Sequence, residues 1–552
     1  ASGAISAPAS GSERRAPAPV LIGDAMTPVE PPPEALPPLI RSLCDPNRYP
    51  HPVDRVKIIE THVSYVLLAG DFAYKIKKAV SLGFLDFSRL HRRHFFCEEE
   101  LRLNARFAPQ IYLDVVPICG TPDSPRWGGG APIEYAVRMR RFSQGSVALA
   151  LAANREIGGE EGEALASMMA AMHAAAPAAG KAAPFGLPDV VGEQARGNLD
   201  ALQRLLDGGT AMALLGELSA WTEVMLKRFA PQFVERHAKG AVRECHGDLH
   251  LGNICWLDGG PVAFDCLEFD PSLRWIDVMS EVAFLLMDLL DHGLNAAAWR
   301  CLDHYLEITG DYDGLPVLRF YLVYRALVRA KVAAIRASQE GGGSDEHRAV
   351  LSYLRLAGDL IRDQHRALFL MHGLSGSGKS TVSQQLVDTL GFLRLRSDVE
   401  RKRMHGLAPG ARGDDATRAK MYSATVNESV YGRLCERGVA LAVAGWPVVV
   451  DAAFLKRDER DRFRAAATRH GLKFRIVSCT APMDVLRDRV ERRALQGRDP
   501  SDATVEVLER QRGVVEPLAV EEITCSVAAD SARPESYLGP LRTLLGDSPF
   551  RG

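Results

Sequence analysis

The stretch that decides the fold of the second half of this chain reads Gly373-Leu374-Ser375-Gly376-Ser377-Gly378-Lys379-Ser380. It matches the spacing GxxxxGK(S/T), with an apolar run at residues 367–371 before it and Thr381 opening a helical pattern after it. Glycines in such a loop let backbone N–H groups surround phosphate oxygens, and the helix start adds partial positive charge. The sequence therefore predicts a phosphate-binding loop, in which Lys379 reaches the β- and γ-phosphates of ATP and Ser380 binds Mg²⁺.

A carboxylate at the end of a later strand pattern extends this predicted site. The apolar run at residues 448–450 ends in Asp451. At this place after a phosphate-binding loop, an aspartate holds the metal through water, so we predict Asp451 as a metal ligand. Helix and strand patterns alternate from residue 366 onward, which predicts a doubly wound parallel sheet.

Charged residues follow the predicted second strand of the same region. Residues 396–403 read Arg-Ser-Asp-Val-Glu-Arg-Lys-Arg. Asp398 is the candidate that orients or deprotonates an acceptor hydroxyl, and Arg401 is a candidate contact for an anionic acceptor. The alternative is an N-cap followed by a solvated, charged helix face.

Arginines also crowd residues 487–498, before a loop-like segment. We expect this segment to close over the γ-phosphate as a lid, with Arg489 and Arg493 among the contacts. A solvated helix with ion pairs one turn apart is the alternative.

A second catalytic pattern lies in the middle of the chain. Residues 246–253 read His-Gly-Asp-Leu-His-Leu-Gly-Asn, and Asp265 ends a strand pattern twelve residues after Asn253. Asp248 can accept the proton of a substrate hydroxyl, while Asn253 and Asp265 can hold Mg²⁺ on the phosphates of ATP. A turn with ordinary buried polar groups is the alternative, but the spacing of all three groups makes the pattern specific.

The strand-rich region before this pattern has the order strand, strand, helix, strand, strand, which suits a small lobe that covers a nucleotide. Strand patterns at residues 64–68 and 72–77, joined by a turn at residues 69–71, predict a β-hairpin. Such a lobe needs a strand lysine for the α- and β-phosphates and a helix glutamate that holds the lysine. Lys75 and Lys77 share one strand face, and Glu98, Glu99 and Glu100 are the candidate glutamates. The pattern leaves the pair open; we favour Lys75 and Glu100. The region has no GxGxxG loop.

The patterns divide the chain into four parts. Residues 1–40 are rich in Ala and Pro and are expected to be a disordered tail. Residues 41–142 form the strand-rich lobe, residues 143–362 a mostly helical lobe, and residues 366–552 the P-loop domain.

Composition agrees with several folded domains. The chain has 552 residues, of which 47% are apolar and 25% charged, so one core is not expected. The net charge of −2 does not favour nucleic acid as a partner. Without a long uncharged apolar run or paired cysteine motifs, we expect a cytoplasmic protein with free thiols and no membrane contact. The sequence favours no oligomeric state.

The motifs carry a resemblance to known families. The P-loop region resembles gluconate kinases, polynucleotide 5′-kinases and zeta toxins, and the region around Asp248, Asn253 and Asp265 resembles the aminoglycoside phosphotransferase family. The whole order is similar to bacterial bifunctional proteins that fuse these two domains. The resemblance implies a multidomain α/β and α+β protein: a bilobal protein-kinase-like module, with Asp248 as base, followed by a doubly wound P-loop kinase domain.

The function implied is ATP-dependent transfer of the γ-phosphate to hydroxyl groups at two sites with Mg²⁺, on small-molecule acceptors. One alternative is a nucleic-acid 5′-end kinase, which the spacing from Asp398 to Arg401 motivates. The other is an ATP-dependent regulatory switch with one inactive module, which the missing GxGxxG motivates.

Overall fold

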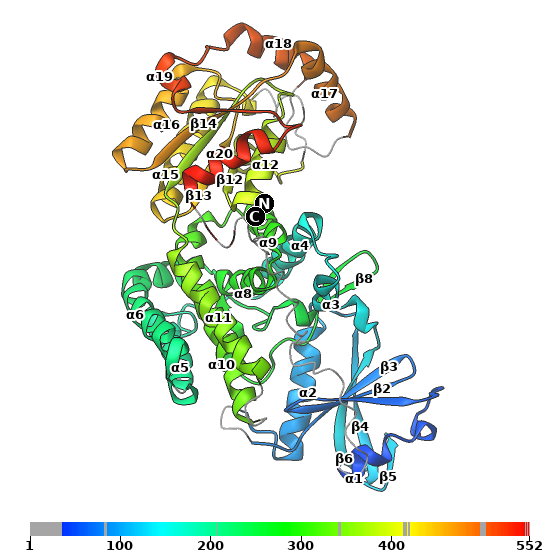
Figure 1. Ribbon diagram of the computed structural model, residues 1–552. Helices are drawn as coiled ribbons and strands as arrows, with labels where there is room; N and C mark the ends of the chain where they lie inside the picture. The colour runs from blue at the N-terminus through cyan, green and yellow to red at the C-terminus, as the bar shows by residue number, and fades with distance from the viewer. Residues whose placement is uncertain are drawn as a thin grey trace, which may run out of the picture.

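The computed structural model describes residues 36–81, 85–206, 208–339, 344–411, 414, 417, 420–496, 504–546, 548 and 550. Most of the predicted N-terminal tail therefore lies outside the described residues. The strand-rich lobe, the helical lobe and the parallel-sheet region follow one another along the chain, and Figure 1 shows them as three adjoining regions. No helix among these residues is long and apolar enough to cross a membrane.

The strand-rich lobe is a six-stranded antiparallel sheet of order β1-β2-β3-β6-β4-β5. Its elements are α1 (Pro38–Ser42), β1 (Val56–Glu60), β2 (Ser64–Ala69), β3 (Phe72–Lys77), α2 (Leu90–Asn104), β4 (Tyr112–Thr121), β5 (Ser124–Trp127) and β6 (Pro132–Arg140). The predicted hairpin is confirmed: Ala69 pairs with Phe72 across a turn in which Gly70 has φ +57°. Helix α2 packs on β6 and β4, which brings its Glu100 next to the lysines of β3.

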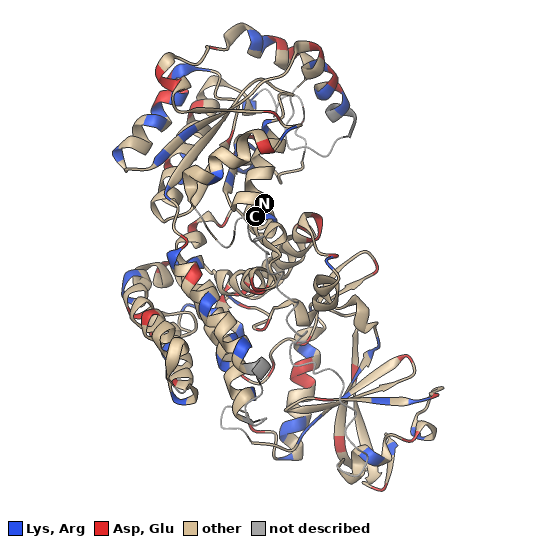
Figure 2. Ribbon diagram, viewed as in Figure 1, with Lys and Arg blue, Asp and Glu red and all other residues tan. Residues whose placement is uncertain are grey.

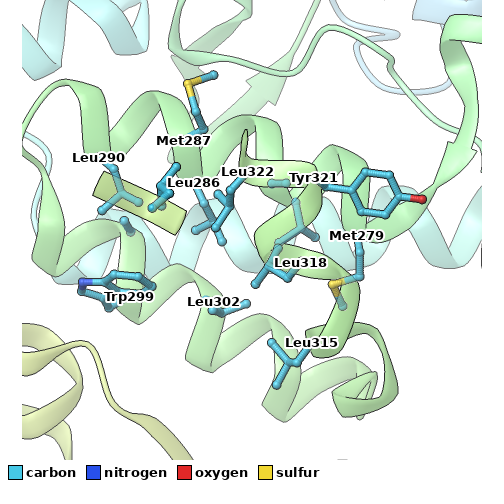
Figure 3. Close-up of a cluster of buried hydrophobic side chains, with 14 of the residues drawn as sticks. Met279, Leu286, Met287, Leu290, Trp299, Leu302, Leu315, Leu318, Tyr321 and Leu322 are labelled. Atoms are coloured by element: carbon cyan, nitrogen blue, oxygen red, sulfur yellow. The ribbon is translucent and has the colours of Figure 1, made fainter. Parts of the chain in front are cut away.

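The helical lobe is built around α8, a helix whose side chains from Val278 to Leu290 are all buried. Figure 3 shows how α8, α9 and α10 interleave Leu, Met and aromatic side chains at its centre. The elements are α3 (Ala148–Ala153), α4 (Gly159–Ala175), α5 (Pro188–Leu205), α6 (Gly209–Ala238), β7 (Val242–Glu244), β8 (Ile254–Leu257), β9 (Gly260–Ala263), α7 (Pro271–Arg274), β10 (Trp275–Asp277), α8 (Val278–Asp291), α9 (Asn295–Thr309), α10 (Leu315–Gln339) and α11 (Ser344–Arg362).

The third region confirms the predicted parallel sheet, with strand order β12-β13-β11-β14-β15. Its elements are β11 (Ala367–His372), α12 (Lys379–Leu390), β12 (Leu393–Arg396), α13 (Ser397–Met404), α15 (Ala424–Val443), β13 (Pro447–Asp451), α16 (Arg457–Arg469), β14 (Lys473–Cys479), α17 (Met483–Gln496), α18 (Val505–Val514), α19 (Val520–Ile523), β15 (Ser526–Ala529) and α20 (Glu535–Leu545). The central strand β11 is buried along its whole length, as a strand covered on both faces must be.

The helical lobe and the P-loop region share one continuous hydrophobic cluster, which runs from α8 and α9 to α15 and β13. Helix α9 packs against α12 and β12, and Figure 1 shows it where the two regions meet. Trp299 of α9 donates its indole N–H to the Phe550 carbonyl at 3.0 Å, and Trp446 donates to the Leu315 carbonyl at 3.3 Å. Figure 2 shows basic and acidic residues interleaved along the outer helices.

Candidate active sites

The loop from β7 to β8 carries the first candidate site. The amide Nδ2 of Asn253 donates to the Asp248 carbonyl at 3.0 Å and to its Oδ2 at 3.1 Å. Asp265 follows β9 and has φ +62°, an uncommon conformation for a non-glycine residue, which its N–H bond to the Tyr112 hydroxyl helps to hold. The N–H of Phe264, the residue before Asp265, donates to the Asn253 carbonyl at 2.9 Å, so Asp248, Asn253 and Asp265 form one cluster, called the loop cluster.

His246 holds this loop in shape. Its Nε2 lies 2.9 Å from the Phe264 carbonyl, and its Nδ1 accepts the Asp248 N–H at 3.4 Å. Burial lowers the pKa of His246, so the ring is neutral, as these two contacts require.

The electrostatics keep Asp248 ionised. Burial raises the pKa of this carboxyl, but His250, with Nε2 at 3.5 Å, and the more distant Arg329 and His246 outweigh burial, so the pKa lies well below its usual range. At neutral pH Asp248 is therefore an acceptor of hydrogen bonds, which suits a group that orients a substrate hydroxyl.

Three residues support the loop through contacts that the sequence analysis did not predict. Glu281 accepts the Gly247 N–H at 2.7 Å, Asp288 accepts the Leu251 N–H at 2.8 Å, and Arg325 donates to the Gly247 carbonyl at 3.1 Å. The signal was available for two of them, because Glu281 and Asp288 interrupt an otherwise apolar helix and lie two turns apart, on one face.

The strand-rich lobe places both lysines against one glutamate. Lys75 forms ion pairs with Glu100 Oε1 at 2.9 Å and Asp265 Oδ1 at 2.5 Å. Lys77 contacts Glu100 Oε2 at 2.7 Å and also the Glu268 carboxylate. Only Lys75 bridges to the loop cluster, whereas Lys77 is 1% exposed. The structure thus separates two lysines that the strand pattern could not distinguish.

The other two candidate glutamates point elsewhere. Glu99 pairs with Arg102 at 2.7 Å and with Arg274 at 2.8 Å, and Glu98 lies 3.4 Å from His94 on the exposed face of α2. Glu100 alone of the three contacts the lysines, because its helical position faces the sheet and its side chain is fully buried.

The second candidate site lies at the carboxyl end of the parallel sheet. Gly373, Gly376 and Gly378 have φ of +141°, +81° and +95°, and a Cβ on Gly373 would lie 2.2 Å from a backbone carbonyl oxygen. Lys379 begins α12 and donates to the Leu374 carbonyl at 2.9 Å, which folds its side chain over the loop. This left-handed, glycine-dependent backbone is the form that a phosphate-cradling loop takes.

The predicted metal-side groups gather at neighbouring strand ends. Asp451 ends β13, directly opposite Arg396 of β12, and accepts the Ser383 hydroxyl at 3.2 Å. The same hydroxyl lies 3.1 Å from the Ser380 carbonyl, so Asp451 is next to the first turn of α12. Parallel strands put these groups together because their carboxyl ends meet at one edge of the sheet, where the chain order reverses.

Acceptor-side and lid candidates have different surroundings. Asp398 lies in the first turn of α13, where the Tyr422 hydroxyl donates to it at 3.3 Å. Arg401 is buried and donates to the Met421 carbonyl and to Asn427, so it offers no exposed cation to a nucleic acid. Arg489 of α17 donates to the Gly376 carbonyl at 3.3 Å, directly at the loop. The side chain of Arg493 lies outside the described residues.

Comparison with known proteins identifies both regions. The model of the phosphotransferase enzyme family matches residues 89–321, and an AAA-domain model matches residues 368–518. Solved structures that are similar to parts of this chain include a gluconokinase from Sinorhizobium meliloti 1021, which is 23% identical over 33% of this chain and 95% of that chain (TM-score 0.24). A choline/ethanolamine kinase family protein from Mesorhizobium loti is 12% identical over 57% of this chain and 89% of that chain (TM-score 0.35).

Relatives span most of the chain as well. Uncharacterized proteins of Mycobacterium tuberculosis and Mycobacterium bovis are 30% identical over 466 residues, which is 83% of this chain and 90% of theirs. The predictions of a kinase-like module followed by a P-loop domain, and of an ATP-dependent kinase, are confirmed at the level of these families. The chain therefore belongs to the family of these mycobacterial proteins, which joins a kinase-like phosphotransferase domain to a P-loop kinase domain.

Proposed function

We propose that this kinase has two Mg²⁺–ATP sites and that each transfers the γ-phosphate to a hydroxyl group of a small metabolite. The observation that carries the proposal is the convergence of Asp248, Asn253 and Asp265 in the loop cluster, with Lys75 of the opposite lobe 2.5 Å from Asp265. We also propose that the tail, the two lobes and the P-loop domain are divided at residues 40, 142 and 362–366. The last boundary agrees with the ends of the elements, since α11 ends at Arg362 and β11 begins at Ala367.

The donor groups suit Mg²⁺ at the first site. The amide N–H groups of Asn253 donate to Asp248, whereas its amide oxygen accepts no hydrogen bond from the described residues. Asp265 adds a carboxylate that is 38% exposed, and carboxylate and amide oxygens are the ligands that Mg²⁺ prefers. When bound there, Mg²⁺ would neutralise charge on the phosphates.

Asp248 then acts on the acceptor. Its ionised carboxylate orients the acceptor hydroxyl; the hydroxyl oxygen bonds to the γ-phosphorus while the bond from that phosphorus to the β,γ-bridging oxygen breaks. ADP leaves and the hydroxyl proton passes to Asp248. Because the pKa of Asp248 is lowered, the carboxylate is a weak base, so we expect it to contribute mainly by orientation before the proton moves.

The P-loop residues suit a second nucleotide. Ser377 Oγ is buried without a hydrogen-bond partner among the described residues, as expected of a hydroxyl that awaits a phosphate oxygen. Lys379 supplies charge for the β- and γ-phosphates, while Ser380 and Asp451 would hold Mg²⁺ directly and through water. Asp398 is the proposed base there, and Arg489, with Arg493, would cover the γ-phosphate.

The experiment follows label from γ-labelled ATP into a fractionated pool of small hydroxyl metabolites. We compare the wild type, Asp248→Asn and Lys379→Ala, with Asp200→Asn, an exposed aspartate on α5, as matched control. Labelled products that disappear separately in the two site variants, and persist in the control, would support two transferases. Release of inorganic phosphate alone from every fraction would instead favour the regulatory switch, and label on oligonucleotide 5′ ends would favour the nucleic-acid alternative.

A further inference from the structure

Helix α9 is linked to the catalytic loop of the kinase-like domain by a buried chain of hydrogen bonds. The Tyr305 hydroxyl lies 2.8 Å from His173 Nδ1, and His173 Nε2 lies 3.1 Å from Glu281 Oε2. The other oxygen of Glu281 accepts the Gly247 N–H at 2.7 Å, next to Asp248. Three helices, α9, α4 and α8, therefore meet through buried polar groups that end at Gly247, the residue before the proposed base.

The same helix reaches the P-loop site from its other side. Glu307 Oε1 accepts a hydrogen bond from Arg396 Nη1 at 3.4 Å, and Arg396 Nε lies 3.8 Å from Asp451 Oδ2. One turn earlier on α9, Asp303 pairs with Arg394 at 2.7 Å. Since Arg394 and Arg396 point from β12 toward one helix, the position of α9 and the environment of Asp451 depend on each other.

The contact between α9 and β12 is incompletely bonded. Arg394 Nε and Asp303 Oδ1 are both buried, and neither has a hydrogen-bond partner among the described residues. A bidentate arginine–carboxylate pair would satisfy both atoms, whereas the observed pair has one hydrogen bond, from Arg394 Nη2 to Asp303 Oδ2. Arg394 also contacts Glu307 Oε1 at 3.4 Å, and a small shift of β12 against α9 that brought Arg394 Nε to Asp303 Oδ1 would add a hydrogen bond.

We propose that α9 couples the two nucleotide sites: Glu307 acts as a positioning residue for Arg396 beside Asp451, and Tyr305 does so for the catalytic loop through His173 and Glu281. The proposal rests on the proposed function, because it requires a nucleotide at each site. Phosphates and Mg²⁺ next to Asp451 change the charge that Arg396 faces, and so its attraction to Glu307. The resulting shift of α9 alters the support of Gly247, and reciprocity requires the reverse effect as well.

The test is calorimetric titration of the full chain with Mg²⁺ and a nonhydrolysable ATP analogue. Lys379→Ala isolates the kinase-like site, and Asp265→Ala isolates the P-loop site. With coupling, the wild-type isotherm departs from the sum of the two single-site isotherms by a factor of about five or more in one dissociation constant. A wild-type isotherm equal to that sum would overturn the coupling, whereas single-site variants that bind nothing would instead refute the proposed function.

Two conservative variants then locate the link. Tyr305→Phe removes the hydroxyl that contacts His173, and Glu307→Gln removes the negative charge that faces Arg394 and Arg396. Either variant should return the isotherm to the sum of independent sites while both sites still bind. Ile308→Ala, an exposed residue of the same helix, is the matched control and should keep the departure. Thermal melting shows which of the two variants fold, and each variant tests the link independently of the other. Unchanged departure in a folded Tyr305→Phe or Glu307→Gln protein would contradict this route through α9.

Discussion

Replacing each β3 lysine by methionine should give opposite outcomes. Lys77 is 1% exposed, between Glu100, which is fully buried, and Glu268. Burial alone would lower the pKa of Lys77, but Glu100 and Glu268 reverse the effect and keep its ammonium charged. In Lys77→Met both carboxylates stay buried with only Lys75 between them. Removing one partner of a buried ion pair costs about 3–5 kcal/mol, which lowers the melting temperature by roughly 10 °C.

Lys75→Met should mainly damage turnover. Glu100 keeps its contact with Lys77, and Asp265 is 38% exposed, so water compensates for the lost ion pair. We expect a stability loss of about 1 kcal/mol, and a fall in kcat/KM of about 10²- to 10³-fold, since the charged group that we propose stabilises the phosphates is lost.

The assay measures turnover of γ-labelled ATP in a Lys379→Ala background, where only the kinase-like site remains, together with thermal melting. Lys57→Met, an exposed lysine on β1 of the same sheet, is the control and should match the parent protein in both measurements. If Lys77→Met folded normally but lost turnover while Lys75→Met turned over normally, the assignment of the two lysines would be refuted.

Three further perturbations follow from the P-loop region and its boundary. Burial lowers the pKa of His372 to about 4, so below about pH 6.5 this imidazole is protonated in the unfolded chain but stays neutral in the folded domain. Up to about 3 kcal/mol of the free energy of unfolding should therefore be lost between pH 6.5 and pH 4, and His372→Gln should reduce this pH dependence, measured by urea unfolding. Asp303→Ala should cost about 3 kcal/mol, because the buried Arg394 keeps only its longer contact with Glu307 at 3.4 Å, whereas the double change Asp303→Leu with Arg394→Met should recover most of the loss; an equal loss in both proteins would contradict this. Gly376→Ala places a Cβ 2.7 Å from a carbonyl of α17 at φ +81°, so nucleotide affinity at the P-loop should fall about ten-fold or more, while Gly432→Ala, with open space around it, should bind normally in the same titration.

Local sequence was sufficient for the backbone of both candidate sites. The glycines before Lys379 predicted a loop between a strand and a helix, and the structure has that loop with positive φ at Gly373, Gly376 and Gly378, because glycine conformation is decided by sterics within a few residues. The hairpin of β2 and β3 and the buried strand ending at Asp451 followed from alternation and apolar runs for the same reason.

Partners far apart in the chain needed the tertiary structure. Lys75 and Asp265 are 190 residues apart, and both lysines of β3 had equal claims until packing put Glu100 between them. The supports Glu281 and Asp288 looked like interruptions of an apolar helix. Their role appeared only in the structure, where α8 packs beneath the loop that carries Asp248. There the two carboxylates accept backbone N–H groups of the loop at 2.7 and 2.8 Å.

The sequence by itself determined which residue types form each candidate site, and the order of the two domains along the chain. The tertiary structure decided which charges meet, and that α9 contacts both domains through Tyr305, Asp303 and Glu307. The physical reason is range: backbone conformation responds to neighbours a few residues away, whereas ion pairs and buried hydrogen bonds depend on which elements pack together, and packing is a property of the whole chain.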